Sequence, residues 1–205
     1  MMFQLALTGS IAMGKSEVSR MFRRFGIPVY DADAAVHEIY ARGGIGVGPV
    51  GSLHPSAIVD GAVDRDRLSK LVVGDTAAIK ELEAVVHPLL GANRASFLEE
   101  ARRTKAPLVV LDVVMLFETG GERRVDAVAV VSAPYDVQRQ RVLARPGMTA
   151  EKFAGILARQ TPDEEKRRRA DYVIDTNTSL EETRGRVREI IRDITGEEPK
   201  EVAPC

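Results

Sequence analysis

The residues with the clearest chemical meaning lie near the start of the chain, in the stretch Gly9-Ser10-Ile11-Ala12-Met13-Gly14-Lys15-Ser16. This stretch fits the pattern G-x-x-x-x-G-K-[ST], in which a loop between a strand and a helix surrounds phosphate groups with backbone N–H groups. Lys15 can reach the β- and γ-phosphate oxygens, and the Ser16 hydroxyl can bind Mg²⁺. The sequence therefore predicts a nucleotide-phosphate site. The residues expected to line it are Gly9, Ala12, Met13, Gly14, Lys15, Ser16 and Glu17.

Two aspartates, Asp31 and Asp33, stand directly after the second apolar run of the chain. In an open α/β sheet, ligands bind beyond the carboxyl ends of the strands, so both side chains are expected near the phosphate loop. A kinase needs a carboxylate that orients and deprotonates the attacking hydroxyl group. We expect Asp33 to be this base and Asp31 to have a structural or metal-side role. The alternative is that one aspartate only caps the next helix.

Two further features suit a phosphoryl-transfer site. Asp112 ends the third apolar run, where a carboxylate can hold Mg²⁺ through water, although an ordinary strand-end acid would occupy the same place. Arg141 and Arg145 are spaced to share one helix face, and the helix-breaking pair Pro146-Gly147 follows them. Arginines on a helical lid could bring positive charge to the transferring phosphoryl group, whereas the alternative is a solvated helix face.

The combination of loop, carboxylates and arginines favours a kinase that uses ATP and Mg²⁺ over a nucleotide-driven switch. A GTPase would need a guanine-reading Asn-Lys-x-Asp motif, and the sequence contains none. The single Asp-x-x-Gly match, Asp193–Gly196, falls in the expected terminal helix and is typical of a helix end. The sequence therefore predicts phosphoryl transfer from ATP to a hydroxyl group on a small, nucleotide-like substrate.

Five short apolar runs are expected to form the strands that position these residues. They are Phe3–Leu7, Ile27–Tyr30, Leu108–Val113, Ala127–Val131 and Tyr172–Ile174. Helical patterns separate most of the runs, which predicts a three-layer α/β fold of the P-loop NTPase type with a parallel sheet of about five strands. The gap between the second and third runs is longer than one crossover needs, so we expect a helical insertion at about 34–106. A lid is expected at about 139–169, which leaves a core of about 1–33, 107–138 and 170–196.

Several helix boundaries can be predicted from capping residues. Thr76 is a candidate N-cap, and Pro88 is expected to open a second helix that lasts to about Lys105. The run Thr161-Pro162-Asp163-Glu164 has the form of a capping box with Thr161 as the cap. A last helix is expected near Leu180–Ile194.

The bulk composition argues against several classes of protein. The 205 residues carry a net charge of −1, which disfavours a nucleic-acid surface, and 44% of them are hydrophobic, which is enough for a core. No apolar run approaches the length of a membrane helix, and the first residues are expected to form a strand rather than a signal peptide. The lone cysteine, Cys205, excludes an internal disulfide. We therefore expect a cytoplasmic protein that binds neither nucleic acid nor membrane.

In their order along the chain, these motifs resemble the dephospho-coenzyme A kinase family. The resemblance covers nearly the whole length and rests on Leu7-Thr8-Gly9, Gly14-Lys15-Ser16, Asp31-Ala32-Asp33, Asp64-Arg65, Leu82-Glu83, His87-Pro88, Leu116-Phe117-Glu118, Ile156-Leu157-Ala158-Arg159-Gln160 and Ala170-Asp171-Tyr172-Val173-Ile174-Asp175. It implies transfer of phosphate from ATP to the ribose 3′-hydroxyl of dephospho-CoA, the last step of coenzyme A synthesis. It also implies a core domain, a helical CoA-side domain and a lid.

The resemblance also suggests roles for individual residues. The aspartate matching Asp33 is the proposed base of the family, and Lys15, Arg141 and Arg145 would complete the catalytic set. The loop near Asn177 would lie close to adenine. The residues on the acceptor side would be Arg65, His87, Leu116, Phe117 and Glu118.

The phosphate loop departs from the usual family sequence Gly-Gly-Ile-Gly-Ser-Gly-Lys-Ser-Thr at four positions. Ser10, Ala12, Met13 and Glu17 are the residues found there, and Val114 replaces a usual proline before the Leu-Phe-Glu run. The Cβ atom of Ala12 is expected to restrict the loop, and Glu17 adds negative charge near the phosphates. Two alternatives therefore stay open. The chain could be another small-molecule P-loop kinase, or a nucleotide-binding relative with impaired catalysis.

Overall fold

The computed structural model describes residues 2–202 of the chain, so the expectation about Cys205 lies outside the described residues. The chain divides into two compact units. One comprises the residues up to Tyr30 and from Ala101 onward, and the other comprises Asp31–Glu100. The second unit overlaps the stretch at about 34–106 where the sequence predicts a helical insertion. Each unit is described separately below.

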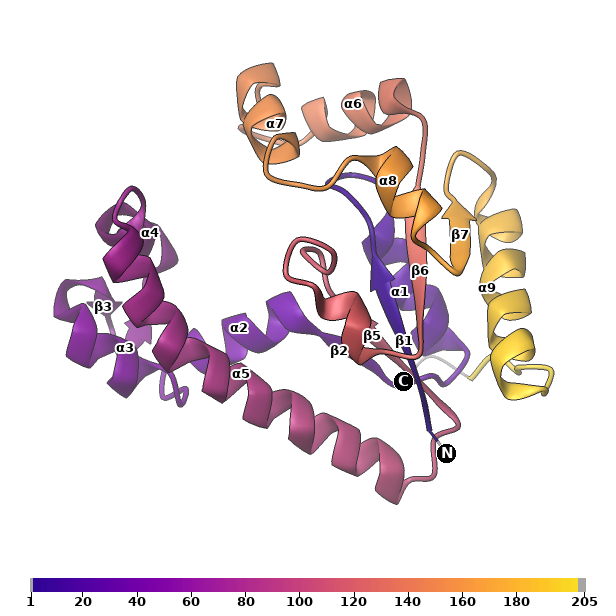
Figure 1. Cartoon of the computed structure of the whole chain (residues 1–205), viewed down its shortest axis with the longest axis horizontal. Helices are drawn as coiled ribbons and strands as arrows, with labels where there is room; N and C mark the ends of the chain where they lie inside the picture. Colours follow the sequence, from indigo (N-terminus) through magenta and orange to yellow (C-terminus); the bar gives the residue numbers. More distant parts are fainter. Residues whose placement is uncertain (1, 203–205) are drawn as a thin grey trace. The chain divides into compact units, whose positions relative to one another are not determined.

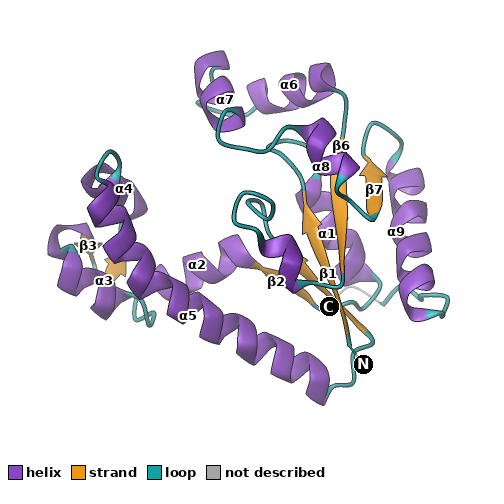
Figure 2. Ribbon diagram, in the orientation of Figure 1, coloured by secondary structure: helices purple, strands orange, loops and turns teal. Residues whose placement is uncertain are grey.

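The first unit is built on a five-stranded sheet with the strand order β2-β5-β1-β6-β7 (Figures 1 and 2). The strands are β1 (Phe3–Thr8), β2 (Val29–Asp31), β5 (Leu108–Asp112), β6 (Ala127–Ser132) and β7 (Tyr172–Asp175). Neighbouring strands from β5 to β7 pair in parallel. The sequence prediction of about five parallel strands is confirmed. All residues of β5 and β6 are buried, as expected for central strands that are covered on both faces.

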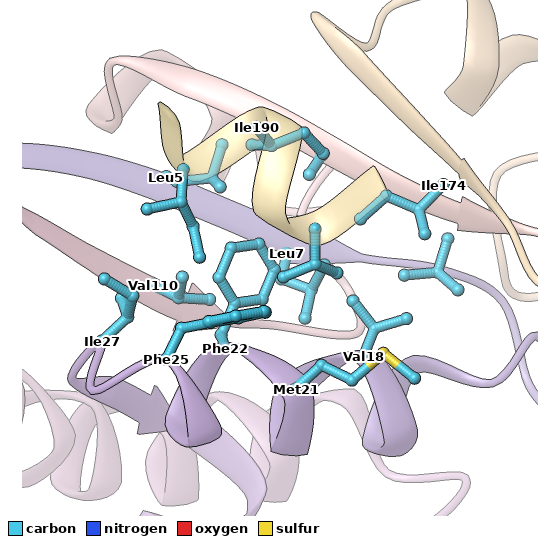
Figure 3. Close-up of a cluster of buried hydrophobic side chains, with 14 of the residues drawn as sticks. Leu5, Leu7, Val18, Met21, Phe22, Phe25, Ile27, Val110, Ile174 and Ile190 are labelled. Carbon is cyan, nitrogen blue, oxygen red and sulfur yellow. The ribbon is translucent and has the colours of Figure 1, made fainter. Parts of the chain in front are cut away.

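Side chains alternate between the two faces of this sheet. Leu5 and Leu7 point to one face, where they meet helix α1 (Lys15–Arg24) and helix α9 (Leu180–Thr195) (Figure 3). Phe22 on α1 and Ile190 on α9 are fully buried in this cluster. Ala6 points to the other face. There it packs in a separate cluster with Leu116 and Phe117, which belong to the segment that follows β5. This two-sided burial fixes the carboxyl ends of β1 and β5, from which the phosphate loop and Asp112 project.

Three short helices follow β6 and complete the first unit. They are α6 (Tyr135–Leu143), α7 (Ala150–Leu157) and α8 (Asp163–Arg168), and a short 3₁₀ helix, η2 (Gly121–Arg124), precedes β6. The capping box predicted at Thr161 is wrong, because α8 begins after Pro162 without a side-chain cap. The Thr161 N–H instead donates to the Glu118 carboxylate, 2.6 Å away. The predicted last helix is confirmed as α9, which begins with a capping box between Ser179 and Glu182.

The second unit is mostly helical and has its own small core. Its elements are α2 (Ala32–Tyr40), α3 (Val47–Leu53), the 3₁₀ helix η1 (Pro55–Ala57), the antiparallel pair β3 (Ile58–Val59) and β4 (Ala62–Val63), and α4 (Arg65–Val72). The long helix α5 (Thr76–Arg103) leads back to the first unit. Buried residues such as Ile39, Val50 and Leu68 form the core. The β3–β4 pair was not predicted, because two-residue strands leave no periodic signal.

The predicted helix break at Pro88 is wrong. Helix α5 continues through Pro88 from Thr76 to Arg103. Val86 and Leu89, on either side of the proline, pack into the same apolar cluster, and this packing outweighs the backbone hydrogen bond that a proline removes. The predicted cap at Thr76 is also displaced by one residue, since the Asp75 carboxylate accepts the N–H groups of Ala77 and Ala78.

Within residues 2–202, no helix combines the length and the apolar character that crossing a lipid bilayer requires.

Candidate functional site

The two glycines that frame the phosphate loop are required for different reasons. A Cβ atom on Gly9 would lie 2.7 Å from the Val131 carbonyl oxygen, so the loop could not leave β1 so close to β6. Gly14 has a φ of +91°, and a Cβ atom there would also meet Thr176 at 3.1 Å. Gly14 is the N-cap residue of α1 and has no side chain to occupy the first amides of that helix. Those amides therefore stay available for an anion.

Ala12 and Met13, two of the departures from the usual loop sequence, are both buried. Ala12 adopts a φ of +62°, a left-handed conformation that costs an L-residue roughly 1–2 kcal/mol. The residue is only 8% exposed, and its methyl group packs in a cluster with Val142 and Phe153. Met13 extends into the main core, and its sulfur accepts the Ala133 N–H at 3.2 Å. The departures therefore add packing between the loop and its surroundings.

The loop backbone is also held by side chains from distant parts of the first unit. The Gln138 amide on α6 donates to the Ile11 carbonyl at 2.8 Å. The Ile11 N–H donates to the Gln160 side-chain oxygen at 3.2 Å. The Thr176 hydroxyl donates to the Met13 carbonyl at 2.7 Å. These three bonds use the backbone of Ile11 and Met13 and hold the loop from three separate parts of the first unit.

Lys15 and Asp112 are brought together as an ion pair at the carboxyl end of the sheet. Asp112 is opposite Leu7 in the register of β1 and β5, and only 3% of its side chain is exposed. The buried carboxylate gains a positive partner, and the lysine is held at the mouth of the loop. Among residues 2–202, no three His, Cys, Asp or Glu side chains converge on a metal cage. The Ser16 hydroxyl and the Asp112 carboxylate still fit the oxygen donors that Mg²⁺ takes beside water and phosphate.

The two predicted lid arginines have different surroundings. Arg141 donates to the Thr176 hydroxyl at 2.9 Å and to the Thr176 carbonyl at 2.7 Å, so it is attached to the segment that follows β7. Arg145 is exposed in the turn after α6. Asn177 is also exposed, and its N–H donates to the Asp175 carboxylate at 2.7 Å. The structure therefore brings Arg141 to the phosphate loop through Thr176 and leaves Arg145 open to solvent.

Glu17 forms an ion pair with Arg20 on the exposed side of α1. The negative charge that Glu17 adds near the loop thus has a positive charge beside it on the same helix. This pair reduces the repulsion that the sequence predicts between Glu17 and a bound phosphate.

The Leu116–Glu118 stretch makes internal contacts in this structure. Leu116 and Phe117 are buried in the cluster beneath the sheet. The Glu118 carboxylate forms an ion pair with the fully buried Lys166 at 3.3 Å and accepts the Thr161 N–H. Burial alone would raise the pKa of Glu118, but these hydrogen bonds and the Lys166 charge outweigh it and lower the pKa. A role for this stretch in holding a substrate stays a prediction.

The remaining predicted residues belong to the second unit. Asp31 caps α2 by accepting the Ala34 N–H at 2.9 Å, which is the structural alternative that the sequence left open. Asp33 is exposed in the first turn of the same helix. Arg65 lines a pocket of about 320 Å³ together with polar residues of α2 and α4. His87 is exposed on α5, outside the residues that line this pocket.

Three residues that contact the phosphate loop were missed in the sequence analysis. Gln138, Gln160 and Thr176 are uncharged, and they are far from the loop along the chain. Gln160 stands in one of the motifs that carry the family resemblance, but no pattern around Gln138 or Thr176 in the sequence points to the loop. A cavity of about 640 Å³ lies beside the loop, and its polar lining includes Ser10 as well as both glutamines.

Comparison with known proteins gives a consistent result across the chain. Residues 3–182 match the protein-family model described as dephospho-CoA kinase. A dephospho-CoA kinase from Mesorhizobium japonicum is 53% identical over 196 residues, which cover 96% of this chain and 98% of the relative. The crystal structure of TT1252 from Thermus thermophilus is 37% identical with a TM-score of 0.80, and the match covers 95% of this chain and 99% of the other. A dephospho-CoA kinase structure from Campylobacter jejuni, 20% identical with a TM-score of 0.65 and a match covering 95% and 98% of the two chains, shares the fold.

Proposed function

This chain belongs to the dephospho-CoA kinase family, and from that premise we propose that it transfers the γ-phosphoryl group of ATP to the ribose 3′-hydroxyl of dephospho-CoA. The products would be CoA and ADP, which makes this the final step of coenzyme A biosynthesis. The observation that supports the proposal most strongly is the arrangement of the phosphate loop. Its glycines allow close backbone approach, and Lys15 is held at its mouth by Asp112.

The phosphate loop would supply most of the binding energy for the nucleotide. Its backbone N–H groups and the first amides of α1 would surround the β-phosphate, where the helix dipole also favours negative charge. Lys15 would turn from Asp112 to the β- and γ-phosphate oxygens when ATP enters, because the phosphates carry the greater negative charge. Arg141 would lie beside the adenine ring, near Asn177. Arg145 would approach the transferring phosphoryl group when the lid closes.

We propose that Mg²⁺ accompanies ATP and that Ser16 and Asp112 would hold it. A bound Mg²⁺ supplies neutralisation of phosphate charge and alignment of the phosphate oxygens. When Lys15 moves to the phosphates, the Asp112 carboxylate would lose one positive partner and could turn to the ion or to one of its water ligands. The same movement of Lys15 would thus prepare the lysine for the phosphates and the aspartate for the cation.

The acceptor side would be provided by the second unit. We propose that Asp33 accepts the proton of the 3′-hydroxyl group, because its carboxylate is exposed at the start of α2 and is free of the capping role that Asp31 fulfils. Arg65 would hold an anionic part of dephospho-CoA near its pocket, and His87 would contribute to the same side.

Coupled ADP release tests the proposal directly. The purified chain is incubated with ATP, Mg²⁺ and dephospho-CoA, with adenosine and AMP as matched controls for the acceptor. The expected result is ADP release that depends on dephospho-CoA and is at least about 100-fold faster than with either control, because only the full substrate uses remote binding energy. Equal rates with AMP would indicate another small-molecule kinase. ATP binding without turnover of any acceptor would indicate an impaired relative.

A further inference from the structure

Two glutamine side chains form hydrogen bonds with the two backbone polar groups of Ile11 in the phosphate loop. Its carbonyl accepts the Gln138 amide at 2.8 Å, and its N–H donates to the Gln160 side-chain oxygen at 3.2 Å. Gln138 lies on α6 and is only 2% exposed, whereas Gln160 follows α7 and is half-buried. The two glutamines therefore come from the two ends of the α6–α7 segment and meet at one residue of the loop.

The chemistry of the backbone fixes which end of each glutamine must be used. A backbone N–H can only donate, so Gln160 has to present its carbonyl oxygen to Ile11. A backbone carbonyl can only accept, so Gln138 has to present its NH₂ group. The two glutamines thus have opposite hydrogen-bonding roles toward the same residue, and a substitution that suits one position is wrong for the other.

Packing strengthens this connection between the loop and the α6–α7 segment. The side chains of Ile11 and Ala12 lie in one apolar cluster with Val142 and Phe153. Ala12 holds its left-handed conformation between Ile11, which the glutamines fix, and Met13, whose carbonyl accepts the Thr176 hydroxyl. A strained residue keeps its conformation only when its neighbours are held from outside.

We propose that Gln138 and Gln160 are positioning residues, which clamp Ile11 so that the phosphate loop keeps its binding shape before ATP arrives. The inference rests on the proposed function, because it assigns the loop to nucleotide phosphates. Both glutamines line the cavity beside the loop, but their hydrogen bonds go to the backbone of Ile11. Their effect comes through preorganisation: a loop that is already in its bound shape loses less conformational freedom on binding. The clamp also ties that shape to both ends of the segment expected to close over ATP.

The test exploits the opposite roles of the two glutamines. The variants are Gln160→Glu, Gln160→Leu, Gln138→Glu and Gln138→Leu, and Gln140→Glu on the exposed face of α6 is the charge control. Gln160→Glu keeps an acceptor oxygen for the Ile11 N–H, whereas Gln138→Glu places a carboxylate against the Ile11 carbonyl. Both variants add the same charge beside Ile11. The difference between their Kd values for ATP therefore reports the direction of the hydrogen bond that each position needs.

The measurements are the Kd for ATP by calorimetry without an acceptor, and KM and kcat for both substrates. The Kd of Gln160→Glu for ATP is expected to lie within about threefold of the Kd of Gln140→Glu. Gln160→Leu and Gln138→Glu are expected to bind roughly tenfold more weakly, since each loses a part-buried hydrogen bond. The KM for dephospho-CoA is expected to stay at the wild-type value in all variants, which separates loop positioning from a general loss of structure.

Three results would overturn the clamp. They are wild-type ATP affinity in Gln160→Leu, equal losses in Gln160→Glu and Gln160→Leu, and equal affinities in Gln160→Glu and Gln138→Glu. If the buried Gln138 variants do not fold, the half-buried Gln160 pair with the Gln140→Glu control still decides the question. A wild-type chain that binds ATP but does not phosphorylate dephospho-CoA would refute the proposed function and leave the ATP-affinity comparison intact. A wild-type chain that binds no ATP would overturn both.

Discussion

Ala12 offers a sharp test of how the phosphate loop is stabilised, because three effects of replacing it with glycine nearly cancel. Its φ of +62° means that Ala12→Gly relieves roughly 1–2 kcal/mol of left-handed strain. The same change removes the methyl group of a residue that is only 8% exposed, which costs about 0.8 kcal/mol. Glycine also gains freedom in the unfolded chain, which costs a further ~0.5–1 kcal/mol. We therefore expect Ala12→Gly to change the free energy of unfolding by less than about 1 kcal/mol.

Two further variants separate the terms in this sum. Ala158→Gly is the matched control, because Ala158 is exposed and has an ordinary φ of −61°. It should be destabilising by ~0.5–1 kcal/mol through the unfolded state alone. Ala12→Val should be destabilising by at least ~2 kcal/mol, because a β-branched side chain tolerates the left-handed region poorly and the cluster around Val142 and Phe153 has to move.

Urea unfolding followed by circular dichroism measures all three free energies under the same conditions. A loss of more than about 2 kcal/mol in the free energy of unfolding of Ala12→Gly would show that Ala12 carries no left-handed strain. An Ala12→Val variant as stable as the wild type would show that the cluster has unfilled space beside Ala12. An increase of more than about 1 kcal/mol in the free energy of unfolding of Ala12→Gly would show that the methyl group contributes nothing to the packing.

Three other predictions concern the charged residues. Lys15→Ala should reduce turnover to below about 1% of wild type, because the β- and γ-phosphate charge loses its partner, and coupled ADP release measures the loss. Asp33→Asn should lower kcat by at least about 100-fold with little change in the Kd for ATP, and a near-wild-type kcat would exclude Asp33 as the base. Glu118→Gln should be destabilising by about 2 kcal/mol at pH 7, since the fully buried Lys166 loses its counter-charge. Because the pKa of Glu118 is lowered in the folded chain, its stabilisation is present above the free value of 4.5 and is lost as pH falls through the folded pKa. The difference between wild type and Glu118→Gln in urea unfolding should therefore be greatest at neutral pH and close below about pH 4.5, and a difference that grows in acid would contradict this assignment.

The sequence predicted the parts of the fold whose residues carry a local pattern. The apolar runs of β5 and β6 were found because strands buried on both faces are continuously hydrophobic. The last helix was found from its periodicity, and the phosphate loop from its glycines and Lys15. The break at Pro88 was predicted wrongly because a capping preference at one residue competes with apolar contacts over several turns, and the contacts prevailed.

Several features of the candidate site depend on contacts that cross the chain. Nothing around Thr161 in the sequence indicates that its N–H would donate to Glu118 instead of opening a capping box. No local pattern indicates that Gln138 and Gln160 bind the same residue of the loop, because both are far from Ile11 along the chain. Ala12 was expected only to restrict the loop, whereas its methyl group packs against α6 and α7.

By itself, then, the amino-acid sequence determined the chemistry that this protein has available: a glycine-framed loop with Lys15 and Ser16, and carboxylates at the ends of strands. Residue type and short spacing are sufficient for that, because phosphate binding needs particular atoms at particular places in one continuous segment. The groups that hold the loop in shape, and the charges that neutralise each other, such as Lys15 with Asp112, became known from the folded chain. Those outcomes depend on distances between segments that folding brings together, and such distances have no signature within any single segment.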